Sequence, residues 1–126
     1  MRTTFLTDRG VRICLLDFSN IPDEETALLA IEEAKRVIAQ ERPKSVYTLT
    51  DVTGSRVTSR IRAALHALTQ ANAPYVVAGA VVGATNLQMV ILRGIVQLTK
   101  RRLVVSKSRG EACDWLVNEA RGATPR

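Results

Sequence analysis

The sequence predicts a single α/β domain over residues 1–126, in which strands alternate with helices around a mostly parallel sheet. Three observations support this class. Short apolar runs rich in β-branched residues recur along the chain, segments with a helical spacing of apolar residues lie between them, and prolines, glycines and other turn residues mark the boundaries. We therefore expect a sheet of four to five strands, four helices and a short antiparallel strand at the N-terminus.

The N-terminal elements are a short lead-in strand, a buried strand and a helix. The lead-in strand around residues 5–6 is closed by turn residues 8–10 and followed by the apolar run at residues 11–18. Pro22 and the three acidic residues after it are typical of a helix start, because they suit the unpaired amides and positive dipole end. The helical pattern stops at Pro43.

The next elements are a second strand–helix unit and a third strand. Residues 45–52 are β-branched and aromatic, and the turn-like residues 53–55 follow them. A helix with an apolar stripe from Val57 to Leu68 then runs to the breaker sequence at residues 72–74. The apolar residues 75–82 predict the third strand.

The C-terminal elements repeat the pattern. A turn at residues 83–86 leads to a helix at residues 87–100, and residues 103–107 form the last strand. The capping box Ser108-x-x-Glu111 opens a final helix that Gly122 closes. Parallel strands joined through helices need right-handed crossovers. Two-layer and three-layer arrangements both satisfy the pattern, and the strand order decides between them.

The composition predicts a cytoplasmic protein. Cys14 and Cys113 lie in apolar surroundings without a metal-binding or disulfide spacing, so we expect reduced thiols. The N-terminus is too polar for a signal peptide. The uncharged run at residues 75–92 is interrupted by glycines and polar residues, which favours a buried strand and a turn over a membrane span.

The net charge of +6 is unevenly distributed. Residues 1–42 carry six Arg/Lys and eight Asp/Glu, whereas residues 43–126 carry twelve and four. A basic cluster at residues 100–102 could attract nucleic acid, but basic residues also suit a helix C-terminus. Because few aromatic residues exist and none lies among these charges, we do not expect a nucleic-acid partner.

Candidate binding residues lie where the predicted strands end, since ligands of parallel sheets bind beyond the carboxyl ends of the strands. An acid pair, a hydroxyl and a lysine at strand ends would suit a phosphoryl-accepting receiver domain. Leu16 stands where a receiver needs its second acid, however, and helix capping and turn formation explain the same residues. We expect neither a metal nor a cofactor. The candidate ligand-binding or partner-binding residues are Asp17, Asp51, Thr53, Gly54, Ser55, Arg56, Gly83, Thr85, Asn86 and Lys107.

A catalytic constellation is not evident in the sequence. His66 is the single histidine, it falls within a helical pattern, and no nucleophile motif accompanies it. We therefore expect a protein that is not an enzyme.

The helix expected at residues 87–100 has two apolar stripes. The second stripe, formed by Met89, Leu92 and Val96, exceeds what a surface helix of a small domain needs. Burial within the chain explains it, and so does an interface with a protein partner or with a second copy in a homodimer.

The order of elements and the hydroxyl-rich segment DVTGSRVTS at residues 51–59 resemble the STAS family of anti-sigma-factor antagonists. The resemblance covers nearly the whole chain. The patterns SVYTLTDVTG, VVGA and EACDWL are similar to uncharacterised bacterial proteins of the STAS-like branch. The resemblance implies a STAS-like fold with a short antiparallel lead-in strand.

The resemblance also implies a phosphorylation site. In STAS members an Asp-Ser pair followed by Ser/Thr-Gly begins the second helix, and a partner kinase phosphorylates the serine. The equivalent place here reads Thr58-Ser59-Arg60-Ile61, which lacks the acid and the glycine. Ser59 is the best positional match and Thr58 the next. Either hydroxyl also serves as a helix N-cap in an unregulated domain.

The resulting expectation is a regulatory or protein-interaction module that is switched by phosphorylation near the start of the second helix. The alternative is a small-molecule domain that binds a nucleotide or a lipophilic ligand in the crevice at the strand ends, with Lys107 and Arg109 close by.

Overall fold

The computed structural model describes residues 1–85, residue 89 and residues 102–122. Five strands form one sheet in the order β1-β2-β3-β4-β5. Their bounds are β1 (Thr3–Asp8), β2 (Val11–Asp17), β3 (Val46–Asp51), β4 (Val76–Val82) and β5 (Arg102–Ser106). The sheet is mixed: β1 and β2 pair antiparallel as a hairpin, and the other three pairings are parallel. The expected antiparallel lead-in strand is therefore confirmed.

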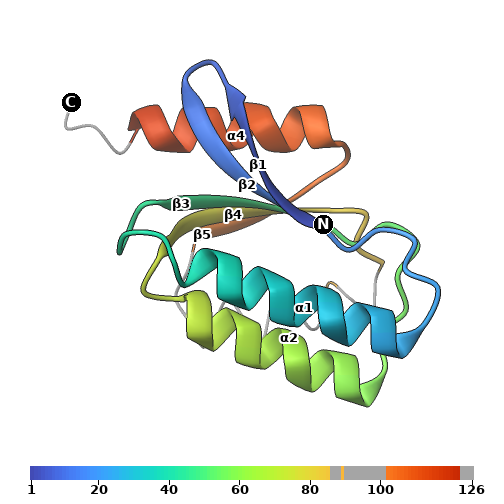
Figure 1. Cartoon of the computed structure of the whole chain (residues 1–126). Helices are drawn as coiled ribbons and strands as arrows, with labels where there is room; N and C mark the ends of the chain where they lie inside the picture. The colour runs from blue at the N-terminus through green and yellow to red at the C-terminus, as the bar shows by residue number, and fades with distance from the viewer. Residues whose placement is uncertain (86–88, 90–101, 123–126) are drawn as a thin grey trace.

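The described residues contain three helices, where four were expected. They are α1 (Glu24–Ile38), α2 (Ser59–Asn72) and α4 (Arg109–Gly122). The remaining expected helix, at residues 87–100, lies outside the described residues except for Met89. Figure 1 shows α1 and α2 side by side on one face of the sheet and α4 on the opposite face, so the domain has three layers.

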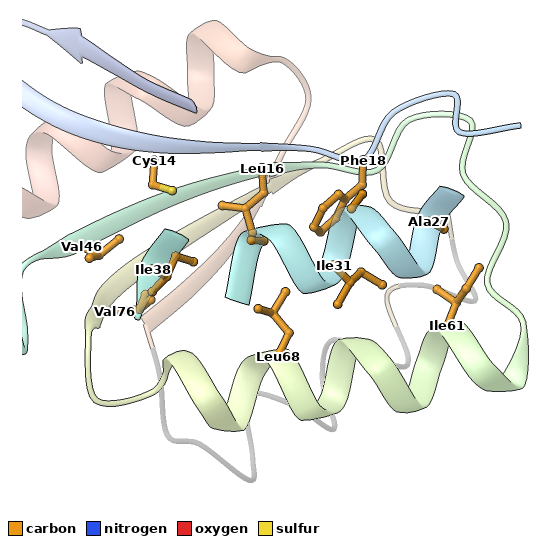
Figure 2. Close-up of a cluster of buried hydrophobic side chains, with 12 residues drawn as sticks. Cys14, Leu16, Phe18, Ala27, Ile31, Ile38, Val46, Ile61, Leu68 and Val76 are labelled. Carbon is orange, nitrogen blue, oxygen red and sulfur yellow. The ribbon is translucent and has the colours of Figure 1, made fainter. Parts of the chain in front are cut away.

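The alternation of side chains along the strands divides the core between the two faces. On the face of α1 and α2, buried side chains of the strands meet those of both helices, as Figure 2 shows for Leu16, Ile31 and Leu68. On the other face Leu49 and Ala80 pack with Leu116 of α4. Each helix thus buries one apolar stripe against the sheet or a neighbouring helix, which is the main stabilising contribution in a domain of this size.

The helix starts follow from local capping. The Asp23 carboxylate accepts the amide of Thr26 at 2.7 Å and begins α1. The predicted capping box at α4 is formed in part: the Glu111 amide donates to Ser108 Oγ at 3.2 Å, whereas Glu111 Oε2 accepts the amide of Lys107, one residue before the cap, at 3.1 Å. Within the described part of the chain, no helix has the length and apolar character needed to cross a membrane.

Candidate functional site

Two of the predicted acids meet at the carboxyl edge of the sheet. Asp17 is the last residue of β2 and Asp51 the last residue of β3, and the two are partners in the parallel register. Arg109, the first residue of α4, joins them. Its Nε lies 2.8 Å from Asp51 Oδ2, and its terminal nitrogen lies 3.3 Å from Asp17 Oδ1.

Each aspartate also accepts hydrogen bonds from a hydroxyl residue two positions later. Asp17 Oδ1 accepts the amide of Ser19 at 3.1 Å and its hydroxyl. Asp51 Oδ1 accepts the amide and the hydroxyl of Thr53 at 2.9 and 2.6 Å. Such Asp-x-Ser/Thr turns arise because a short carboxylate side chain can mimic a backbone turn.

The pKa of both carboxyl groups lies below its ordinary value. Burial by itself would raise the pKa of Asp51, but the hydrogen bonds from Thr53 and the guanidinium of Arg109 outweigh it. The same balance holds for Asp17, where burial is opposed by Ser19 and Arg109. The hydrogen bond with Asp51 in turn raises the pKa of Arg109. The ionised forms therefore hold one another in place.

The turns after the strands pack together, and two predicted glycines lie there. Gly54 has φ +70°, and a Cβ on it would come within 2.3 Å of Asn20 Oδ1. Gly83 has φ +83°, and its Cβ would come within 2.2 Å of Thr53 Oγ1. Neither place accepts a side chain. The amide of Asn20 donates to the Thr53 carbonyl at 2.8 Å and so links the two turns.

The other predicted residues of the strand ends differ in exposure and in their contacts. Lys107 and Thr85 are exposed, and Asn86 lies outside the described residues. Ser55 donates its hydroxyl to the carbonyl of Val52 at 2.8 Å. Arg109 was noted in the sequence only as a nearby basic residue. The signal that could have singled it out is its place directly after the cap Ser108, at the end of a strand.

The start of α2 contains the two candidate phosphorylation residues. Thr58 is the N-cap, and its Oγ1 accepts the amide of Ile61 at 3.2 Å. Ser59 is the first helical residue and is exposed. Arg60 reaches across to α1, with its terminal nitrogen 2.8 Å from Glu24 and 3.1 Å from Glu25.

A cavity of about 340 Å³ lies between α1, α2 and the sheet. Most of its wall is apolar, with Phe18, Leu65 and Leu103 among the lining side chains. The exposed residues of the described wall gather where α1 and α2 begin: they are Pro22, Asp23 and Arg56. We take this end as the opening. A volume of this size is sufficient for a small organic ligand.

The predicted interface stripe falls mostly outside the described residues. Leu92 and Val96 are not described. Met89 is half-buried, and its amide donates to the Thr85 carbonyl at 2.8 Å. Across the described ranges, no group of three or more His, Cys, Asp or Glu side chains is placed to hold a metal ion.

Comparison with known proteins shows a likeness at the level of structure. No family model and no curated protein matches the sequence. A crystal structure of an uncharacterised protein from Shewanella loihica PV-4, described as a DUF3478 family member with a SpoIIAA-like fold, superposes with a TM-score of 0.69. The match covers 90% of this chain and 91% of that chain at 13% sequence identity. The chain therefore has a SpoIIAA-like, or STAS-like, α/β fold, as the resemblance in its sequence predicted.

Proposed function

We propose that this chain is a non-enzymatic regulatory module that binds a partner protein and is switched by phosphorylation at Ser59. The observation that carries the proposal is the position of Ser59, which is the exposed first residue of α2 in a SpoIIAA-like fold. The two aspartates at the strand ends, where ligands of parallel sheets bind, are both paired with Arg109.

The two candidate hydroxyls differ in what they already do. The Thr58 oxygen caps α2, so modifying it would remove a hydrogen bond that starts the helix. The exposed Ser59 side chain can be modified without losing that cap. This difference supports Ser59 over Thr58 as the acceptor.

The charge around Ser59 supports a switch. A phosphate there would lie beside the first amides of α2 and among three arginines, Arg56, Arg60 and Arg62. Arg60 already donates hydrogen bonds to Glu24 and Glu25 of α1. A phosphate would compete for Arg60 and repel both glutamates, which would change the surface where the two helices begin.

Intact mass of the chain purified from its own cells tests the modification. We expect a species heavier by one phosphoryl group under some growth condition, present in the wild type and in Thr58→Ala but absent in Ser59→Ala. A phosphorylated species that persists in Ser59→Ala, or none under any condition, would contradict the proposal.

Capture of the partner tests the switch. We expect the proteins recovered with the wild type to change in amount when Ser59→Glu is the bait. Ser45→Glu is the matched control, because Ser45 is also exposed and lies just before β3, far from the start of α2. If both variants recover the same proteins in the same amounts as the wild type, the switch is rejected.

A second candidate function is small-molecule binding, and the cavity beneath α2 favours it. A ligand that raises the melting temperature of the purified chain would support this function.

A further inference from the structure

Two threonines of β3 line the cavity on the same face of the sheet. Thr48 and Thr50 are two positions apart, so their side chains point to the same side of the strand. Only 5% of Thr48 is exposed. Neither hydroxyl has a hydrogen-bond partner among the residues that the structure describes.

The remaining hydroxyls of the described wall have hydrogen-bond partners within the chain. Thr69 donates to the carbonyl of Leu65 at 2.8 Å, Ser55 donates to the carbonyl of Val52, and Thr58 caps α2. Both oxygens are open to the cavity, since within the described residues the side-chain oxygen that is fully buried without a partner is Thr3 Oγ1. Polar groups in a protein interior nearly always bond to protein or to water, so a hydrogen-bonding atom that enters the cavity would be the partner of this pair.

The other side chains of the described wall indicate the chemical character of the rest of the ligand. The side chains around the pair are apolar, among them Leu16, Ile31, Leu68 and Val81. The charged residues of the described wall are Asp23, Glu24 and Arg56, and they lie at the opening rather than beside Thr48. Among the described residues of the wall, no cation lies beside the two threonines to balance an ionised head group, and burying a charge without a partner is costly. The described wall therefore favours an uncharged head group.

The volume of the cavity limits the size of the ligand. At about 30 Å³ for each water-sized group, a cavity of 340 Å³ holds on the order of ten non-hydrogen atoms. We propose that the cavity binds an uncharged, mainly aliphatic molecule of this size whose single oxygen forms hydrogen bonds with Thr48 and Thr50. This inference rests on small-molecule binding, the second candidate function, and is independent of the switch at Ser59.

The test measures binding of 1-octanol to the full chain by calorimetry and by the shifts of threonine methyl signals in NMR spectra. Octane added to saturation is the probe without oxygen, and octanoate is the probe with a charge. Thr48→Val keeps the shape and removes the hydroxyl. Thr7→Val is the matched control, because Thr7 is an exposed threonine on β1 away from the cavity.

We expect the wild type and Thr7→Val to bind 1-octanol more tightly than octane or octanoate. Thr48→Val should bind 1-octanol about fivefold more weakly, the effect of one net hydrogen bond, while its affinity for octane is unchanged. Unliganded Thr48→Val should melt at the same or a higher temperature than the wild type, because a hydroxyl without a partner in the described chain is replaced by a methyl group in an apolar wall.

Three results would overturn the inference, and they separate it from the function on which it rests. If no probe binds, the cavity is not a ligand site and the second candidate function fails for this cavity. If 1-octanol and octane bind equally well, the cavity takes ligands but the assignment of the two hydroxyls is wrong. If Thr48→Val melts at a clearly lower temperature, the hydroxyl has a partner within the chain.

The variant Leu65→Phe provides a second check, because Leu65 is a half-buried residue of the wall and a larger side chain there fills the cavity. We expect it to lose binding of both 1-octanol and octane. Undiminished binding would place the probes elsewhere on the protein and reject the proposed site.

Discussion

Arg109 is the residue that ties the last helix to the rest of the sheet edge. It lies 58 positions after Asp51 in the sequence, and it bonds both that aspartate and Asp17. The Asp51 residue is only 6% exposed, whereas the Arg109 side chain is 44% exposed. Removing the arginine would leave a buried carboxylate without its cation, which costs more than the loss of an exposed ion pair.

Replacing Arg109 with glutamine should therefore lower the free energy of unfolding by about 1–3 kcal/mol. Arg102→Gln is the matched control, because Arg102 pairs with Glu119 at 3.2 Å on the surface. That change should lower the free energy of unfolding by less than about 1 kcal/mol. Urea denaturation of the two variants measures the difference, and equal losses would show that the Asp51–Arg109 pair is no stronger than a surface pair.

The sequence identified the two aspartates and Thr53, which bonds Asp51, but not the arginine that joins the two aspartates. Asp17 and Asp51 each lie one residue before the end of a predicted strand, so their position near the sheet edge follows from pattern alone. Arg109 and Asn20 reach the same place only through the strand order and the path of the turns. Those depend on contacts between distant segments, which a local pattern does not contain.

At the scale of single elements, α2 shows how one cap decides where a helix begins. The sequence pointed to residues 58 and 59 together, because either hydroxyl satisfies the capping preference. The structure assigns the cap to Thr58. The distinction depends on the backbone, since the cap needs an extended conformation and Thr58 has φ −89° and ψ 169°.

Thr58→Ala should lower the free energy of unfolding by about 1 kcal/mol, because the amide of Ile61 loses its acceptor. Ser59→Ala should change it by less than about 0.5 kcal/mol, as for an exposed residue without such a role. Thermal or urea denaturation of both variants checks this. A larger loss in Ser59→Ala than in Thr58→Ala would mean that the cap is assigned to the wrong residue.

Two glycines in different elements should respond to alanine in opposite ways. A Cβ on Gly79 of β4 would lie 2.8 Å from Thr48 Oγ1 and 3.1 Å from Leu103 Cδ1, so Gly79→Ala crowds the sheet and should cost about 1–3 kcal/mol. A Cβ on Gly110 of α4 would lie 3.8 Å from its nearest neighbour. Gly110→Ala should therefore stabilise the protein by up to about 1 kcal/mol, because alanine favours a helix. Similar changes in melting temperature for both variants would contradict this contrast.

For the whole molecule, the handedness of crossovers explains the layers once the strand order is known. The chain moves from β2 to β3 and on to β4 in one direction across the sheet, and right-handed connections then place α1 and α2 on the same face. The sequence left two-layer and three-layer arrangements open because it did not supply that order. The last helix, α4, follows the final strand, so no crossover constrains it. It covers the other face, where Leu49 and Ala80 need burial.

Acid sensitivity is a property of the whole domain, because carboxylates with lowered pKa tie its parts together. Asp17 and Asp51 join the sheet edge to α4. Glu33 of α1 accepts the amides of Arg2 and Thr3, both at 2.8 Å, at the start of β1, and its pKa is lowered chiefly by the Thr3 hydrogen bond. Groups with a lowered pKa in the folded state stabilise it above the pKa that they have in the unfolded chain.

We therefore expect the free energy of unfolding to be steady near neutral pH and to fall as the pH drops below about 5 and on through the folded-state pKa values. Asp51→Asn should be less stable than the wild type at neutral pH, because its bond to Arg109 loses the charge. It should also lose less stability on acidification, because one of the linked carboxylates is gone. Urea denaturation at neutral and acidic pH measures how far the free energy of unfolding falls in each of the two proteins. If the free energy of unfolding falls no further with acidification in the wild type than in Asp51→Asn, the bond between Asp51 and Arg109 contributes nothing to the acid sensitivity of the domain.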